Sequence, residues 1–213
     1  MVAEHSDERF LLRGENLSAP LDFQSLFGRP CPVEVEIGVG KGRFLLGQAA
    51  QHPEIGFLGI ERSHKYLRIT LERLNRSSCE NVRLVCDDAG FFVRTFIPEH
   101  AVSKYHIYFP DPWPKKRHHK RRLINPNFAG FLFRTLSPGG EIRVATDHLD
   151  YFQEIVRALD SVDRWERKEL WSEPARATEA FGATHYEIKY AREGRTVHHL
   201  SYMAHNPHYS SNC

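Results

Sequence analysis

Apolar runs of strand length alternate with amphipathic stretches from about residue 32 to the end of the last predicted strand. The runs that predict strands are Val33–Ile37, Ile55–Ile60, Asn81–Cys86, Tyr105–Phe109, Glu141–Ala145, Trp165–Trp171 and Val197–Ala204. The stretches that predict helices are Gly42–Gln51, Lys65–Arg76, Ala89–Phe96, Pro126–Leu136 and Leu149–Leu159. Repeated strand–helix units indicate an α/β fold with a mostly parallel, doubly wound sheet covered on both faces.

The ends of the chain lack this alternation. Residues 1–31 predict an irregular N-terminal extension that ends in a turn at Phe27–Pro30, and residues 206–213 predict a frayed tail. Residues 32–205 between them predict one domain. Within that domain, Ser137–Gly140 predicts a turn ahead of the fifth strand.

Positive charge is concentrated in one short segment. The 213 residues carry a formal net charge of +2, yet residues 115–122 contribute six positive charges, which leaves −4 for everything else. With 41% hydrophobic and 26% charged residues, the chain can bury a core and is not a disordered protein. Such polarised charge is typical of a protein that binds a polyanion.

Cysteine, histidine and apolar patterns exclude several classes of protein. The four cysteines form no CxxC pair, and the histidines form no helical i, i+4 ligand pair, so we expect neither disulfides nor a metal site. The N-terminus is polar, and no run of about eighteen apolar residues occurs. We therefore expect a soluble, cytoplasmic protein without a membrane partner; the oligomeric state stays open.

Glycines and acidic residues gather at the carboxyl ends of the first three predicted strands. Glu36, Gly38 and Gly40 lie at the end of the first strand, Glu61 ends the second and Asp88 follows the third. Open α/β sheets bind ligands at this edge. A carboxylate such as Glu61 can accept two hydrogen bonds from a ribose diol, at roughly 1.5–3 kcal/mol each. We therefore predict a ligand that contains a nucleoside.

The charge of these residues distinguishes between nucleotide ligands. Arg43 stands where a dinucleotide fingerprint requires its third glycine, and no P-loop motif occurs. Glu36, just before the glycines, disfavours a pyrophosphate. Four carboxylates, with Asp111 as the fourth, suit a ligand that carries a sulfonium and an ammonium group. The sequence therefore favours S-adenosylmethionine over a nicotinamide dinucleotide.

A proline-rich turn runs directly into the basic segment, in the stretch Phe109–Arg122. Three prolines within five positions fix φ and remove backbone donors, so Asp111 and Trp113 are expected on a stiff loop. A rigid carboxylate beside dense positive charge fits a nucleic acid that is held by its phosphates while chemistry takes place next to Asp111. The competing interpretation is a solvated surface loop in which Trp113 is a buried anchor.

Several segments occur in an order that resembles one enzyme family. They are Glu36–Gly42, Gly59–Glu61, Asp88–Ala89, Phe109–Lys115 with its basic run, Thr146–Asp147 and Thr184–Glu187. Together they closely resemble the tRNA (guanine-N7-)-methyltransferases of the bacterial single-chain type, over roughly residues 33–204. The proline–tryptophan motif joined to the basic run is highly specific, whereas most methyltransferases share the glycine loop.

The resemblance implies a Rossmann-like class I methyltransferase fold with an antiparallel C-terminal strand. It also implies methyl transfer from S-adenosylmethionine to N7 of a guanine in the variable loop of tRNA (position 46 in tRNA numbering). The implied cofactor contacts are Glu36, Gly38, Gly40, Glu61, Asp88 and Asp111. The implied RNA contacts are Lys115, Arg117, Lys120, Arg121, Arg122, Asp147, Thr184, Tyr186 and Glu187. Residues 1–31 match no pattern of the family.

Guanine N7 carries a lone pair and no proton, so the reaction needs no general base. The rate must come from alignment, which can supply up to about 7–11 kcal/mol, and from charge placement. Asp111 is the candidate catalytic carboxylate; whether Asp111 or Asp147 faces the base stays open. Asp147 could instead cap the next helix, Thr184–Glu187 could be an ordinary β-edge, and Trp113 could stack on a base or pack beneath its loop.

Three other functions stay open at this point. A nicotinamide-dependent oxidoreductase on the same fold would leave the basic run unexplained. A non-catalytic RNA-binding module would not need the acidic strand ends. A methyltransferase that acts on another guanine or another RNA would differ only in pocket geometry, which the sequence does not give.

Overall fold

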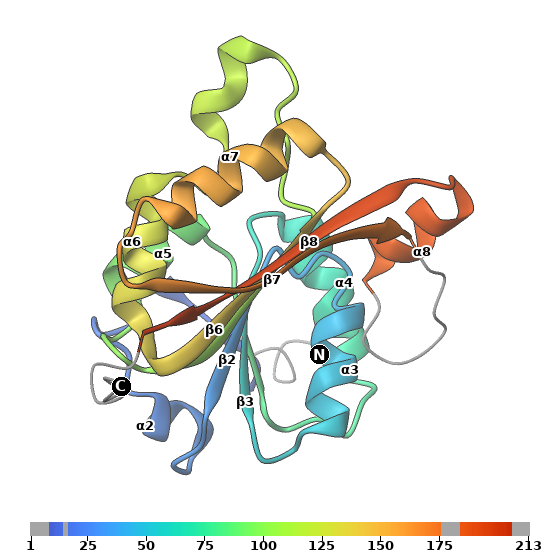
Figure 1. Ribbon diagram of the computed structural model, residues 1–213. Helices are drawn as coiled ribbons and strands as arrows, with labels where there is room; N and C mark the ends of the chain where they lie inside the picture. Colours follow the sequence, from blue (N-terminus) through green and yellow to red (C-terminus); the bar gives the residue numbers. More distant parts are fainter. Residues whose placement is uncertain (1–8, 15–16, 176–183, 206–213) are drawn as a thin grey trace.

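The computed structural model describes residues 9–14, 17–175 and 184–205, which fold around one eight-stranded sheet (Figure 1). Its strands are β1 (Leu11–Leu12), β2 (Val33–Ile37), β3 (Gly56–Ile60), β4 (Val82–Val85), β5 (Val102–Tyr108), β6 (Leu136–Thr146), β7 (Trp165–Pro174) and β8 (Thr196–Ala204). Its helices are α2 (Phe23–Phe27), α3 (Arg43–Gln51), α4 (His64–Leu74), α5 (Ala89–Phe96), the 3₁₀ helix η2 (Lys116–Arg121), α6 (Pro126–Thr135), α7 (Leu149–Asp160) and α8 (His185–Arg192). The predicted tail at 206–213 lies outside the described residues.

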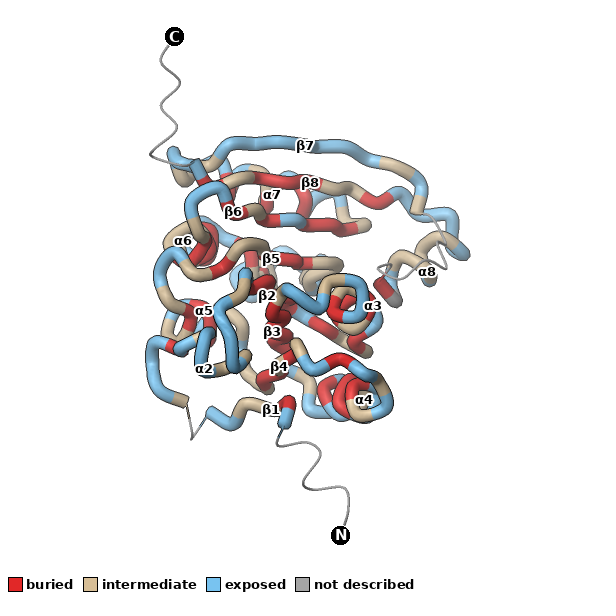
Figure 2. The backbone as a smooth tube through the Cα atoms, turned by 90° about the horizontal axis from the view of Figure 1, so that it is seen from below, coloured by how far each residue is buried: buried red, intermediate tan, exposed pale blue. Residues whose placement is uncertain are grey.

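The sheet is wound in two directions from β2. Its strand order is β1-β4-β3-β2-β5-β6-β8-β7, as Figure 2 shows. The pairings from β1 to β6 are parallel, whereas β8 pairs antiparallel with both β6 and β7. The predicted doubly wound fold with an antiparallel C-terminal strand is therefore confirmed: among the described strands β8 runs opposite to the rest, and β7 beyond it runs in the same direction as β6. The order reverses at β2, so its carboxyl end is the place where such sheets bind ligands.

Helices cover the sheet on both faces and bury two apolar clusters. In Figure 1, α3 and α4 lie on one side of the sheet, and α5, α6 and α7 pack together on the other. Leu45 and Leu71 belong to the cluster under α3 and α4, while Leu132 and Ile155 belong to the larger one under α6 and α7. No helix among the described residues is long and apolar enough to cross a membrane.

Local signals place the start of α6 as predicted. Asn125 caps α6 by accepting a hydrogen bond from the Phe128 backbone N–H at 3.1 Å, and Pro126 occupies the first turn, where its missing N–H costs nothing. The strand Val33–Ile37 and the helix Ala89–Phe96 have the bounds that the sequence predicts.

The prediction that the whole N-terminal extension is irregular is wrong. β1 pairs in parallel with β4 at the edge of the sheet, and α2 follows, capped by the Asp22 carboxylate. Phe10 is fully buried and its carbonyl oxygen accepts from the Leu84 backbone N–H at 2.8 Å. The expected turn at Phe27–Pro30 is present, because Gly28 ends α2 with a φ of 71°. Two residues of strand are too short to leave an alternating pattern in the sequence.

The predicted turn at Ser137–Gly140 lies inside β6. Leu136 pairs with Val102 and Glu141 pairs with Lys104, so four residues of β6 stand opposite the single residue Ser103. The turn residues therefore form a bulge within a longer strand, which ends at Thr146 beside the carboxyl end of β5.

Candidate active site

A pocket of about 240 Å³ lies at the carboxyl end of β2, where the strand order reverses. Its lining includes Glu36, Gly38, Val39, Gly40, Lys41, Arg43, Phe44, Tyr66, Tyr108, Thr184, Tyr186 and Lys189. Gly38 and Gly40 adopt φ values of 82° and 54°, which L side chains rarely adopt. The structure thus brings Glu36, Gly38 and Gly40 together with Thr184 and Tyr186 in one pocket.

Glu36 is a buried residue that lines this pocket. Its side chain accepts a hydrogen bond from the Leu45 backbone in the first turn of α3, whose N-cap residue Gly42 has no side chain to do so. The other oxygen, Oε2, is buried and has no hydrogen-bond partner among the described residues. Burial and the nearby Glu61 raise the pKa of Glu36 to about 8.

Glu61 fixes the glycine turn from the next strand. Its Oε2 accepts from the Gly40 backbone N–H at 2.8 Å, and its Oε1 accepts from the Ser63 backbone N–H at 2.8 Å. Asp88 lies farther along the same edge, outside the pocket lining, where it caps α5 through the Phe91 N–H. The set fits S-adenosylmethionine, because an unpartnered buried carboxylate oxygen suits an ammonium group and Glu61 is held rigidly beside it.

The proline loop after β5 is conformationally strained. Phe109 and Trp113, which flank Pro110–Pro112, have positive φ values of 53° and 44°. Asp111 between them is exposed and does not line the pocket. Burial, Tyr66 and then Asp111 raise the pKa of Tyr186, which places the Asp111 carboxylate within electrostatic reach of the pocket. Trp113 is half-buried and contacts η2, with the Arg121 guanidinium 5.0 Å above its ring.

The basic run forms the short helix η2, which stands away from the body of the molecule in yellow-green in Figure 1. Lys115, Arg117, Lys120 and Arg121 are exposed on it. Arg122 is not, because its side chain is 2% exposed and bonded on several sides. The prediction that Arg122 contacts the RNA is therefore wrong, because its side chain is buried within the protein.

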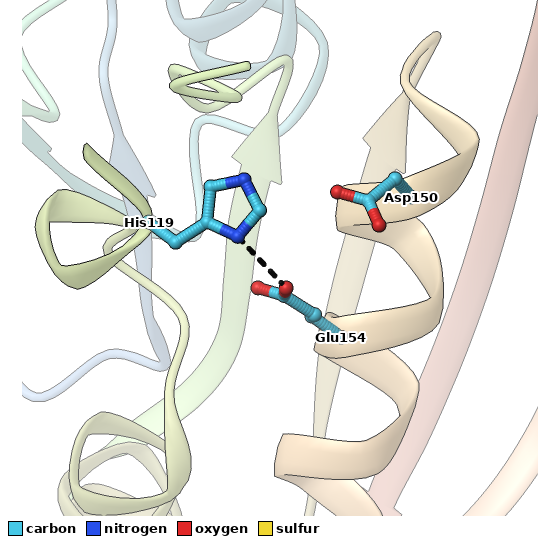
Figure 3. Close-up of side chains that lie close together, drawn as sticks. All are labelled: His119, Asp150 and Glu154. Atoms are coloured by element: carbon cyan, nitrogen blue, oxygen red, sulfur yellow. Dashed lines mark ion pairs between the residues drawn. The ribbon is translucent and has the colours of Figure 1, made fainter. Parts of the chain in front are cut away.

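Arg122 instead ties the proline loop to α7. Its Nε donates to the Pro112 carbonyl oxygen at 2.8 Å, and its two Nη atoms form ion pairs with Asp150 at 2.8 Å and Glu154 at 2.6 Å. Figure 3 shows these two carboxylates together with His119, which lies 3.4 Å from Glu154. The grouping resembles a metal-ligand set, but both carboxylates already contact the Arg122 guanidinium. In this structure the three side chains and Arg122 form one ion-pair cluster.

The remaining predicted RNA contacts gather around α8. Asp147 follows β6 and forms an ion pair with Arg195 at 2.6 Å, so the alternative role as a helix cap is wrong; His148 caps α7 instead. Thr184 and Glu187 form a capping box at the start of α8, so the β-edge interpretation is wrong as well. Their side chains are engaged with backbone N–H groups at 3.0 and 2.7 Å.

Several residues of the site were not predicted from the sequence. Phe44, Tyr66 and Tyr108 line the pocket from three different elements, and Tyr190 contacts Phe109 with ring centroids 5.3 Å apart. Aromatic residues at these positions have the spacing of ordinary core residues. The one available signal is that Tyr186 and Tyr190 share a face of α8 one turn apart.

Comparison with known proteins decides the family. A family model described as "Putative methyltransferase" matches residues 30–200. A tRNA (guanine-N(7)-)-methyltransferase of Geobacter metallireducens is 35% identical over 193 residues, which cover 91% of this chain and 92% of that protein. The chain belongs to the tRNA (guanine-N7-)-methyltransferase family.

Other members of the family match over different lengths. The protein of that name from Salmonella typhimurium is 34% identical, over 93% of this chain and 84% of its own. The one from Nitrosococcus oceani is 42% identical over 67% of this chain and 60% of its own. Membership in an enzyme family that uses S-adenosylmethionine argues against the nicotinamide-dependent oxidoreductase.

Solved structures of other methyltransferases share the fold. A mutant 16S rRNA (adenine(1408)-N(1))-methyltransferase from Catenulisporales acidiphilia, solved with its cosubstrate SAM, superimposes with a TM-score of 0.63 at 16% identity, over 92% of this chain and 96% of that chain. TrmN from Thermus thermophilus gives a TM-score of 0.60 at 18% identity, over 85% of this chain and 46% of that chain. The likeness is one of fold.

Proposed function

We propose that this protein transfers a methyl group from S-adenosylmethionine to N7 of a guanine in the variable loop of tRNA. The observation that carries the proposal is Glu36, a buried carboxyl group with an unpartnered oxygen at the switch point of a methyltransferase fold. An ammonium group is the kind of partner that this oxygen lacks. The acceptor follows from the family, because the relatives carry this activity in their names.

Residues at the ends of β2, β3 and β4 would hold successive parts of the cofactor, from its ammonium group to its nucleoside. Bound S-adenosylmethionine supplies a methyl group on a positively charged sulfur. Glu36 would bind the ammonium group, and the glycine turn at Gly38 and Gly40 admits the ligand close to the backbone. Glu61, already fixed by two backbone N–H groups, would accept from the ribose hydroxyls, and Asp88 would lie beside the far end of the nucleoside.

Carboxylates near the pocket would stabilise the positive charge that develops on the purine. Asp111 is held on a strained loop that Arg122 anchors through the Pro112 carbonyl, so its position is set before substrate arrives. Asp147 would accept from the N1–H and N2–H groups of guanine, an edge that adenine lacks. The protein needs to align the base and place charge; it does not need to remove a proton from N7.

Exposed cations on η2 would bind the RNA backbone. Lys115, Arg117, Lys120 and Arg121 project into solvent beside the loop that carries Asp111. N7 of a base in an A-form helix lies in a groove too narrow for side chains, so a loop guanine is the accessible acceptor. The proposal therefore joins phosphate contacts on η2 to an unstacked base near Asp147.

Methyl transfer to an unmodified tRNA transcript tests the proposal. We expect the wild-type protein to incorporate labelled methyl groups, and Asp111→Asn to lose most of kcat because a carboxylate charge beside the reacting base is removed. Asp163→Asn is the matched control, since Asp163 is exposed on the turn between α7 and β7. Near-normal turnover in Asp111→Asn would show that the Asp111 carboxylate does not act at the reacting centre. Absence of methyl transfer by the wild-type protein would refute the function itself.

A further inference from the structure

The Asp147 carboxylate is already bonded within the protein. Arg195, which follows α8, places its Nη1 2.6 Å from Asp147 Oδ2, and its guanidinium carbon lies 4.5 Å above the ring of Tyr190. The Nε atom of the same side chain contacts Glu193 at 2.7 Å. Arg195 therefore has two carboxylates, Asp147 and Glu193, at its edge and an aromatic ring against its face.

This arrangement matches what a guanine base would need. The N1–H and N2–H groups of guanine belong to an N–C–N unit that presents two parallel donors in one plane, as a guanidinium does. A carboxylate accepts from both in the same way, and an aromatic ring can stack on either plane. Adenine presents an acceptor at N1, so a carboxylate at this place repels it.

The Arg195 position is continuous with the cofactor pocket. The Tyr190 ring contacts Phe109 at 5.3 Å and Tyr186 at 5.8 Å between centroids, and Tyr186 lines the pocket itself. The Phe109 backbone N–H donates to the Ala145 carbonyl oxygen at 2.7 Å, which fixes the end of β5 beside the end of β6, two residues before Asp147. A base held by Tyr190 and Asp147 would therefore lie next to the pocket that we assign to the cofactor.

We propose that Arg195 is a placeholder for the target guanine. In the free protein its guanidinium occupies a base-binding subsite formed by Asp147 and Tyr190, and it leaves when guanine enters. Glu193 gives the displaced side chain a partner, since it already contacts Nε. The inference rests on the proposed function and adds to it two elements, Tyr190 as the stacking surface and Arg195 as the competitor that a correct base displaces.

Replacement of Arg195 tests the placeholder. Arg195→Ala should lower KM for tRNA about two- to fivefold, the factor that corresponds to an exposed ion pair, with kcat unchanged. The control is Arg192→Ala, which removes an exposed arginine from the last turn of α8 and should not lower KM. An unchanged KM in Arg195→Ala would overturn the proposal, because Arg195 would then not compete with the base. A raised KM would overturn it as well, because Arg195 would then contact the RNA.

Variants of Tyr190 test the stacking surface separately. Tyr190→Phe keeps the ring and should retain the wild-type KM, whereas Tyr190→Ala should raise KM for tRNA. Equal loss in both variants would overturn the stacking role. Thermal melting of each variant shows that it is folded. All these measurements require a wild-type protein that methylates tRNA, so failure of the proposed function would be seen first and independently.

Discussion

At the scale of single residues, Glu36 carries the most information. The residue is 4% exposed, and burial together with Glu61 raises its pKa to about 8. At neutral pH the folded protein therefore keeps a proton that the unfolded chain releases. The contribution of Glu36 to the unfolding free energy is therefore complete below about pH 4.5. It is lost as the pH rises toward 8, because the unfolded chain releases the proton first. A cationic ligand would reverse that trend by favouring the ionised form.

This proton leads to a prediction for cofactor binding. The affinity of the wild-type protein for S-adenosylmethionine should rise between about pH 6.5 and pH 8.5, with proton release on binding. Glu36→Gln should bind about tenfold or more weakly and lose the pH dependence. At pH 8 its unfolding free energy without ligand should be higher by about 1–3 kcal/mol. Calorimetry and urea unfolding measure both effects, with the exposed Glu54→Gln as the control; a pH-independent wild-type affinity would contradict the assignment.

At the scale of secondary-structure elements, the edge strand β1 joins the N-terminal segment to the sheet. We expect Phe10→Ala to lower the unfolding free energy by about 3–5 kcal/mol, because a fully buried aromatic ring leaves a cavity. Urea unfolding measures this loss, and Arg13→Ala, at an exposed position beyond β1, should change little. Equal effects of the two substitutions would show that the segment is not packed as described.

Sequence patterns predict several elements from periodic burial and local caps, but they miss α2 and α8, although Asp22 and Thr184 cap these helices locally. The end of β2, the helix Ala89–Phe96 and the Asn125 cap follow from such signals. β1 is too short for a pattern, and the bulge in β6 depends on its pairing with β5. Arg122 shows the same limit at the site: within a basic run nothing in the sequence distinguishes the one cation that Asp150 and Glu154 hold inside the fold.

At the scale of the whole molecule, exposed cations are concentrated on η2. The pocket has the buried Glu36 in its lining and the buried Glu61 behind its glycine turn, and Lys41, Arg43 and Lys189 line it as well. The buried carboxyl groups suit a cationic group of the cofactor, and the exposed cations suit a polyanionic substrate. The family membership and the fold agree with both.

The exposed cations of η2 predict a salt dependence for tRNA binding. Replacing Lys120 and Arg121 together by Gln should reduce the slope of log affinity against log salt by about two units, since each phosphate contact contributes about 0.9. The control Arg157→Gln removes an exposed charge near the C-terminal end of α7 and should leave the slope as it is. An unchanged slope in the double variant would show that these cations of η2 do not contact the phosphates of the tRNA.

The central claim is that this site methylates N7 of one guanine in tRNA, and nucleoside analysis after methyl transfer tests it most directly. An unmodified tRNA transcript is incubated with labelled S-adenosylmethionine, digested and separated, beside a transcript in which adenosine replaces the variable-loop guanine. We predict label in 7-methylguanosine alone, lost in the second transcript. Label in another nucleoside, or label that persists after the replacement, would contradict the account.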